Sequence, residues 1–342
     1  MRDWRTDPAF EMCRALAEGA DLASFAGGAF DVRAVVAGIQ SGAHSGLLLD
    51  AVPWGNFPHG NDARNAVHLL HTGETPASHA TDVLGGLCAN GSRAAVALAV
   101  PLLTPIATDA RHPHRAAALG VLSSPARAQH FGVASRDELL LHRTGPRRHA
   151  PDDYDDYGVE VTGYPAGWSV AAARAVITAE APVLLPLLND SDPTIRIDAA
   201  YALATAADPH HTVRTALATR FAMDHDAIVR AALLLAAAEI TRAHAHPPTV
   251  WWLRERWRDW TEAPEVRLAA AIGWLCLTDD PVPEDLHQTI NTFATDERAH
   301  AMDALPWMSA AGSGEPGLRR CIRCMVHSED PEPLDDPWAS SP

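Results

Sequence analysis

Residues 191–204, SDPTIRIDAAYALA, contain the signals that decide the fold. Asp192 is a favourable N-cap residue, and Pro193 suits the first helical position because its missing N–H would have no partner there. Apolar residues then recur at helical spacing on one face, at Ile195, Ala199, Ala202 and Leu203. The stretch therefore predicts a helix that begins directly after Asp192.

The same pattern returns twice downstream, at residues 226–236 (DAIVRAALLLA) and 263–275 (APEVRLAAAIGWL). In each copy an arginine follows a β-branched apolar residue and precedes a run of small apolar residues. Arg196, Arg230 and Arg267 are separated by 34 residues (196 to 230) and 37 residues (230 to 267). A period in this range, with two helical segments per repeat, is typical of an α-solenoid.

Further helices are expected between and before these copies. Residues 168–188 form one apolar-periodic segment that Pro182 and Pro186 are expected to kink or split. The other expected helices span 209–222, 247–259 and 112–122, and two more meet at residues 90–91 (Asn-Gly). The chain is therefore predicted to be all-α.

The three arginine-containing copies resemble the second helices of HEAT repeats, a class that includes the phycobilisome-lyase-type HEAT modules. The N-terminal half resembles, more loosely, the leading part of large actinobacterial-type HEAT proteins of unassigned role. Together the two resemblances cover residues 54–277. It implies a right-handed α-solenoid of helix pairs, an α-α superhelix, whose concave face binds a partner. It also implies a structural ladder of Asp192, Arg196, Arg230 and Arg267, with each arginine bonding acidic or carbonyl groups of neighbouring repeats. Only the name of the family suggests a lyase activity. No residue of this sequence points to a bilin substrate.

Four segments are expected along the chain. Residues 1–142 form a diverged HEAT-like half and residues 167–327 form the HEAT repeats. Between them, residues 143–166 (RTGPRRHAPDDYDDYGVEVTGYPA) have no helical period and contain three prolines. This stretch is either a spacer or a functional loop. Residues 328–342 are acidic and proline-rich, which predicts a disordered tail.

The composition is that of a folded protein, with 47% hydrophobic and 20% charged residues. All 27 basic residues are arginine, which excludes lysine-based catalysis. A net charge of −16 makes nucleic acid an unfavourable partner unless arginines cluster on one face. No uninterrupted apolar run of 18 residues and no N-terminal signal pattern is present, so we expect a cytoplasmic protein with no membrane span.

The sequence offers no recognisable catalytic or metal-binding motif. It has 18 histidines, but H-E-x-x-H, G-x-S-x-G, the Walker A loop and a strand-linked G-x-G-x-x-G do not occur. Cys321 and Cys324 form a lone C-x-x-C with His327 nearby and no evident fourth ligand, so metal binding there stays open. We expect no cofactor, no metal and a non-enzymatic function.

Two groups of residues are candidates for contacting a partner. The first is the acidic-tyrosine cluster of Asp152, Asp153, Tyr154, Asp155, Asp156 and Tyr157, where tyrosines supply contact area and acids select a basic partner. The second is a helical face with Trp252, Arg256 and Asp259, beside a second face with Leu253, Trp257 and Trp260.

Two functions follow from these groups. We expect a protein-binding scaffold, regulatory or immunity-type protein whose partner is another protein or a peptide. The alternative is a HEAT-like DNA-binding protein or DNA glycosylase, in which Trp252 stacks on a base and Arg256 contacts phosphate. Against this alternative, tryptophans on a helical stripe are commonly core residues with arginines at their solvated edge. The oligomeric state is left open.

Overall fold

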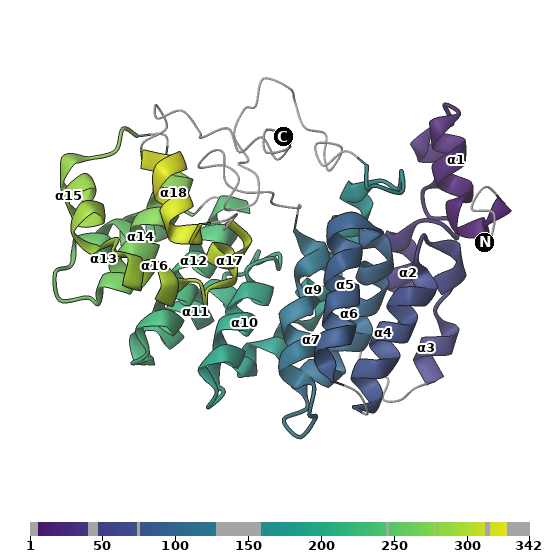
Figure 1. Cartoon of the computed structure of the whole chain (residues 1–342), viewed down its shortest axis with the longest axis horizontal. Helices are drawn as coiled ribbons and strands as arrows, with labels where there is room; N and C mark the ends of the chain where they lie inside the picture. The colour runs from purple at the N-terminus through teal and green to yellow at the C-terminus, as the bar shows by residue number, and fades with distance from the viewer. Residues whose placement is uncertain are drawn as a thin grey trace, which may run out of the picture.

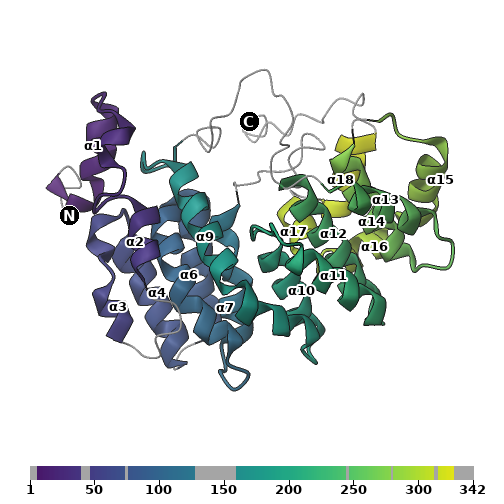
Figure 2. The same cartoon turned by 180° about the vertical axis from the view of Figure 1, so that it is seen from behind.

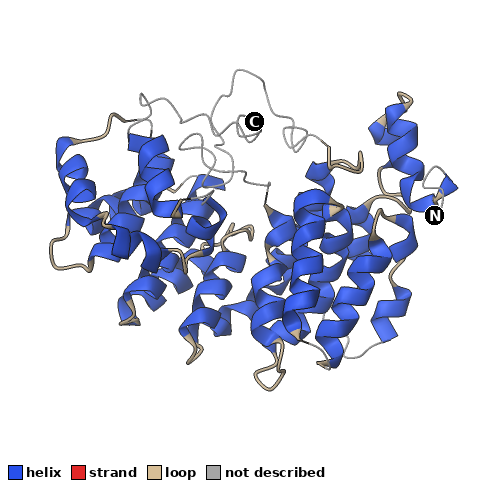
Figure 3. Cartoon of the chain, viewed as in Figure 1, coloured by secondary structure: helices blue, strands red, loops and turns tan. Residues whose placement is uncertain are grey.

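The computed structural model describes residues 6–39, 47–73, 76–127, 159–243, 246–278, 280–311 and 315–326. Within these residues the chain is helical, without a β-strand, and its one isolated β-bridge joins Val159 to Pro165 (Figure 3). The predicted all-α class is confirmed.

The helices before residue 128 form the first half of the molecule. The α-helices are α1 (Glu11–Ala17), α2 (Val32–Gly38), α3 (Leu47–Ala51), α4 (Gly60–Thr72), α5 (Ala77–Asn90), α6 (Arg93–Thr108) and α7 (Arg115–Leu122). Short 3-10 helices accompany them: η2 (Pro8–Phe10), η3 (Leu22–Phe25), η4 (Trp54–Asn56) and η5 (Ser124–Ala126). The chain then continues through α9 (Ala166–Leu184) and the 3-10 helix η7 (Leu185–Asn189).

The remaining helices form the second half. They are α10 (Pro193–Leu203), α11 (Thr212–Met223), α12 (Ala227–Ala243), α13 (Pro247–Arg258), α14 (Pro264–Leu277), α15 (Glu284–Phe293), α16 (Asp296–Met302), α17 (Pro306–Ala311) and α18 (Gly317–Val326). Figures 1 and 2 show the two groups of helices side by side, with α1 at one end of the molecule and α15 at the other.

Several predicted helix boundaries are confirmed. The Asp192 side chain accepts a hydrogen bond from the backbone N–H of Thr194 at 2.9 Å, and α10 begins at the following residue, Pro193. Helix α5 ends at Asn90, where the sequence predicts a break. The predicted segment 168–188 is split, because α9 ends two residues after Pro182 and continues as a 3-10 helix.

Helices that are near in sequence pack against one another. In the second half, α12 packs against both α10 and α14, while α11 packs on α12 and α13 packs on α12 and α14. In the first half, α6 packs against α4, α5, α7 and α9. The halves meet where α7 packs on α10.

Three helices are buried on all their faces. Every residue is buried in 93–101 of α6, 231–242 of α12 and 268–276 of α14. A helix that is apolar all round must be covered on every side. On α12, the covering includes Trp307 of α17, whose indole nitrogen donates to Glu239. The C-terminal helices therefore fold back onto the row formed by α10 and α12.

Among the residues that the structure describes, one segment is long and apolar enough to cross a membrane, by length and composition alone. It comprises α9 and η7, residues Ala166–Asn189, and half of its most apolar window is buried inside the protein. Helix α9 packs against α6 and α2. Its apolar composition thus corresponds to the core position that it occupies.

Candidate functional site

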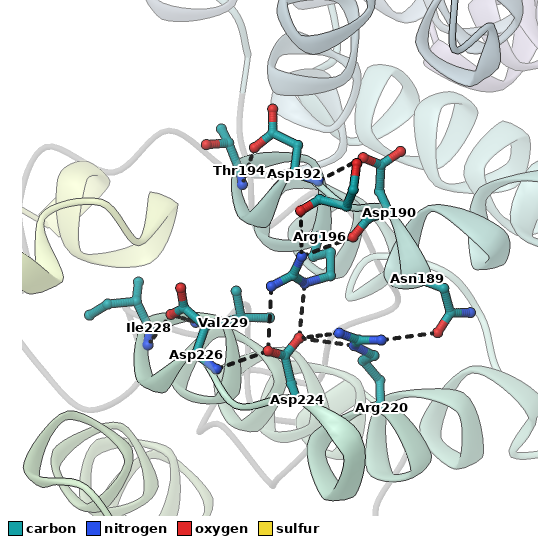
Figure 4. Close-up of polar contacts among 11 residues, drawn as sticks. Asn189, Asp190, Asp192, Thr194, Arg196, Arg220, Asp224, Asp226, Ile228 and Val229 are labelled. Atoms are coloured by element: carbon teal, nitrogen blue, oxygen red, sulfur yellow. Dashed lines mark hydrogen bonds and ion pairs between the residues drawn. The ribbon is translucent and has the colours of Figure 1, made fainter.

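An arginine ladder connects successive helix pairs. Arg196, Arg230 and Arg267 are each the fourth residue of their helix, α10, α12 and α14. Arg196 Nε lies 2.9 Å from Asp224 Oδ2, and Arg230 Nη1 lies 2.7 Å from Glu262 Oε2. Both acids lie in the turn that precedes the next helix of the row. The arginine of one helix pair thus holds the turn of the following pair (Figure 4).

Two further arginines, Arg267 and Arg115, extend the ladder with different contacts. Arg267 donates from Nε to the carbonyl oxygen of Trp257 at 3.0 Å, and its guanidinium lies 4.6 Å from the ring centre of Phe293. Arg115, the first residue of α7, pairs with Asp190 at 2.5 Å, in the turn before α10. Sequence reasoning missed Arg115 because it stands at the first helical position and not at the fourth.

Asp224 is the most densely bonded acid of the ladder. Burial alone would raise its pKa, but the pKa is lowered by the backbone N–H of Asp226 and by the guanidinium groups of Arg220 and Arg196. Arg220 donates to Asp224 Oδ2 from Nε at 2.9 Å and from Nη2 at 2.8 Å (Figure 4). Asp224 is therefore a fixed negative charge between two helix pairs.

The predicted face of Trp252, Arg256 and Asp259 is occupied by contacts within the protein. The Trp252 ring packs edge-on against Phe221 of α11 at 5.1 Å. Arg256 Nη1 donates to Glu262 at 2.9 Å and lies 3.4 Å from Asp259. These side chains join α11, α13 and the following turn, so Trp252 and Arg256 do not form a free base-stacking surface.

The tryptophans of α13 divide between core and solvent. Leu253 and Trp257 are buried, whereas Trp251 is 66% exposed and Trp260 is 84% exposed. The prediction that Trp260 shares a helical face with Leu253 and Trp257 is wrong, because α13 ends at Arg258. Two aromatic rings on or beside one helix thus face solvent.

Other predicted candidates lie outside the described residues. These are the acidic-tyrosine cluster, Asp152, Asp153, Tyr154, Asp155, Asp156 and Tyr157, and the side chains of Cys324 and His327. Cys321 is described, and its side chain is buried. Among the described residues no group of three His, Cys, Asp or Glu side chains could hold a metal ion.

A buried charged cluster joins the two halves, and no local sequence pattern indicates it. Arg127 lies just after η5 and donates to Glu239 of α12 from Nε at 3.0 Å and from Nη2 at 2.9 Å. Its guanidinium carbon lies 3.5 Å from the ring centre of Tyr201. The Trp307 ring packs edge-on against Tyr201 at 4.8 Å and donates to Glu239 at 2.8 Å. Four segments of the chain therefore meet at one ion pair.

The chain matches no protein-family model, no curated protein and no solved structure. By its own contacts it is an all-helical protein whose helix pairs are connected by arginine–acid pairs, with a buried ion pair between its halves.

Proposed function

We propose that the chain is a HEAT-like α-solenoid that binds another protein or a peptide and catalyses no reaction. The regular position of the ladder arginines supports the repeat. Arg196 and Arg230 occupy the same place in successive helices and pair with acids in successive turns. Repeats that contact mainly their neighbours produce long surfaces suited to protein partners.

The observation that carries the binding proposal is the exposure of Trp251 and Trp260. Tryptophan is the residue type most enriched among interface residues that dominate binding energy. Trp251 on α13 is 66% exposed and Trp260, two residues beyond the end of α13, is 84% exposed, whereas α13 buries Trp257. By contrast, Trp307 already covers α12 at Glu239. We therefore place the binding surface on the solvent side of α13.

A protein partner is favoured over nucleic acid by the same geometry. The DNA-binding alternative needs Trp252 free to stack and Arg256 free to contact phosphate. Trp252 packs on Phe221, and Arg256 is paired with Glu262. The net charge of −16 further opposes phosphate binding.

The test is affinity purification of the tagged full chain from its native cell, with bound protein identified by mass spectrometry and bound nucleic acid assayed. The wild type is compared with the double variant Trp251→Ala/Trp260→Ala. The matched control is Val183→Ala, which removes an exposed apolar side chain from α9. Substitutions at such exposed sites change stability by less than about 0.5 kcal/mol, so all three proteins should fold equally well.

We expect one stoichiometric protein that the wild type and Val183→Ala retain and the double tryptophan variant loses. A partner retained by the double variant would remove α13 from the proposal. Replacing Asp152, Asp153, Asp155 and Asp156 with asparagine then tests the acidic-tyrosine cluster as the contact. Salt-sensitive recovery of DNA in place of a protein would support the nucleic-acid alternative.

A further inference from the structure

Residues 159–165 form a tight hairpin immediately before α9. The backbone N–H of Glu160 donates to the carbonyl of Tyr164 at 2.8 Å, and the N–H of Gly163 donates to the carbonyl of Glu160 at 2.8 Å. Gly163 has a φ of +85°, which a residue with a side chain adopts only with strain. Val159 and Val161 are 69% and 79% exposed, so the Glu160 side chain between them turns toward the protein.

The Glu160 carboxyl lies at the N-terminus of α6 and is bonded on one side only. Its Oε1 accepts from the backbone N–H of Ala94 at 3.1 Å and from the hydroxyl of Ser169 on α9. Its Oε2 is buried without a hydrogen-bond partner, as are Thr162 Oγ1 and Arg93 Nε. A buried oxygen without a partner is tolerated better on a neutral carboxyl than on a carboxylate.

The groups around Glu160 leave its charge incompletely balanced. Burial raises its pKa to about 7, although the hydroxyl of Ser169, the charge of Arg93 on α6 and the backbone N–H groups of Ala94 and Arg93 act to lower the pKa. From α1 and α5 the facing groups are the thiols of Cys13 and Cys88.

These two thiols stay neutral near pH 7. Burial raises the pKa of Cys13 to about 11 and that of Cys88 to about 12. Burial also raises the pKa of Tyr164, in the hairpin itself, well above its ordinary value. In this cluster Glu160 is therefore the group that changes charge near neutral pH.

We propose that Glu160 is a proton-operated latch, which holds the hairpin tip and α1 on the N-terminus of α6 when neutral and releases them when ionised. The tip contacts α1 at Gly163, where a Cβ atom would lie 3.6 Å from Cys13 Cβ. Helix α1 lies at the end of the molecule (Figures 1 and 2).

The base of the hairpin stays fixed while the tip moves. The Tyr164 hydroxyl donates to the carbonyl of Phe30 at 2.7 Å and accepts from the N–H of Val32 at 3.0 Å. These two bonds anchor the hairpin to the start of α2 and do not involve Glu160. Gly163, next to this anchor, is the position where the backbone can turn.

The test is hydrogen exchange by mass spectrometry on the full chain from about pH 5.5 to pH 8.5, corrected for the intrinsic pH dependence of exchange. In the wild type, protection of residues 159–163 and of α1 should fall by up to about tenfold per pH unit as the pH rises toward 7 and then level off, because in this range the closed state keeps the Glu160 proton that the open state has lost. In Glu160→Gln this fall should be absent.

Asp198→Asn is the matched control. Asp198 in α10 also has a pKa raised to about 7, by burial and by the charge of Asp192, but it belongs to another cluster. This variant should keep the wild-type fall at the hairpin. A second variant, Ser169→Ala, removes a donor that lowers the pKa of Glu160, so the midpoint of the fall should move to higher pH. Protection that does not change with pH in the wild type, an unchanged fall in Glu160→Gln, or an unmoved midpoint in Ser169→Ala would each overturn the latch.

Discussion

Each half of the molecule has a glutamate with a buried carboxyl oxygen, and the two carboxyl groups are bonded very differently. Glu239 in the second half has partners on both oxygens, with Arg127 Nε on Oε1 and with Arg127 Nη2 and Trp307 Nε1 on Oε2. Glu160 in the first half receives both its hydrogen bonds on Oε1 and none on Oε2. The comparison teaches that the placement of donors, and not burial alone, decides how completely a carboxyl group in the interior is bonded.

The largest expected effect comes from breaking the better bonded site. Glu239→Ala leaves the Arg127 guanidinium, whose side chain is 5% exposed, without its counter-charge. Removing one partner of a buried ion pair costs about 3–5 kcal/mol, so the free energy of unfolding in urea should fall by that amount.

A double variant separates the ion pair from the packing around it. In Arg127→Met/Glu239→Gln neither charge is present, and the glutamine amide oxygen can still accept from Trp307. Replacing a buried pair by uncharged groups of similar size is often close to neutral, so most of the lost stability should return. If the double variant is as unstable as Glu239→Ala, the cost lies in packing and not in the unpaired charge.

The second prediction concerns pH and the less completely bonded site. The folded-state pKa of Glu160 is raised from 4.5 to about 7, so between these pH values the folded state holds a proton that the unfolded chain has lost. The free energy of unfolding should therefore fall as pH rises through this window, with Glu160 contributing on the order of 2 kcal/mol after allowance for its partial exposure.

Unfolding of the wild type and of Glu160→Gln in urea, from about pH 4.5 to pH 8, measures this contribution. Asp198, with its pKa raised to about 7, should add a similar slope that Asp198→Asn removes. Asp31, Asp190 and Asp224 have lowered pKa values. The stability that these carboxylates contribute is therefore lost in a separate window, as the pH falls below about 3.8. Identical slopes in the wild type and in Glu160→Gln would show that Glu160 is not protonated in the folded state near neutral pH.

The sequence predicts the local features of this structure well and its long-range contacts poorly. The cap at Asp192 and the break after Asn90 follow from short-range rules that a single chain segment satisfies alone. The pairing of Arg127 with Glu239 spans 112 residues and has no local pattern. Helical periodicity, when continued past Arg258, places Trp260 on the buried face, but α13 ends at Arg258.

Glu160 shows why the latch proposed at the hairpin is harder to predict than the helices. In the sequence it belongs to an acidic, proline-containing stretch without a helical period, which predicts a solvated spacer or a functional loop. The alternation of Val159, Glu160 and Val161 indicates that Glu160 and the valines face opposite sides, but it does not indicate which side is buried. The tertiary contact with the N-terminus of α6 decides that the Glu160 side is the buried one.

A third prediction compares two arginines of the second half. Arg196→Ala removes one partner of Asp224, whose side chain is 2% exposed, together with the bonds from Arg196 Nη1 to the carbonyls of Asp190 and Ser191. Because Arg220 remains paired with Asp224, the cost should be about 2 kcal/mol, below that of a fully unpaired charge.

The control for Arg196 is an exposed pair. Arg319 and Asp296 are 40% and 94% exposed in their side chains, so Arg319→Ala should cost less than about 0.5 kcal/mol. Thermal unfolding at one pH measures both variants. Equal costs would mean that the ladder does not hold the helix pairs together.

The smallest predicted effects compare a helix cap from each half. Asp192 is exposed and accepts from Thr194 at 2.9 Å, so Asp192→Ala should cost about 1 kcal/mol and Asp192→Asn only a few tenths. Ser92 is fully buried and accepts from the N–H of Ala95 at 3.3 Å, beside the N–H of Ala94 that Glu160 binds. Although its bond is longer, Ser92→Ala should cost more, about 1–2 kcal/mol, because water cannot reach the freed N–H. Urea unfolding of the three variants decides the order. If Ser92→Ala is the milder change, the N-terminus of α6 is open to water, and the buried setting assigned to the Glu160 carboxyl beside it would be wrong as well.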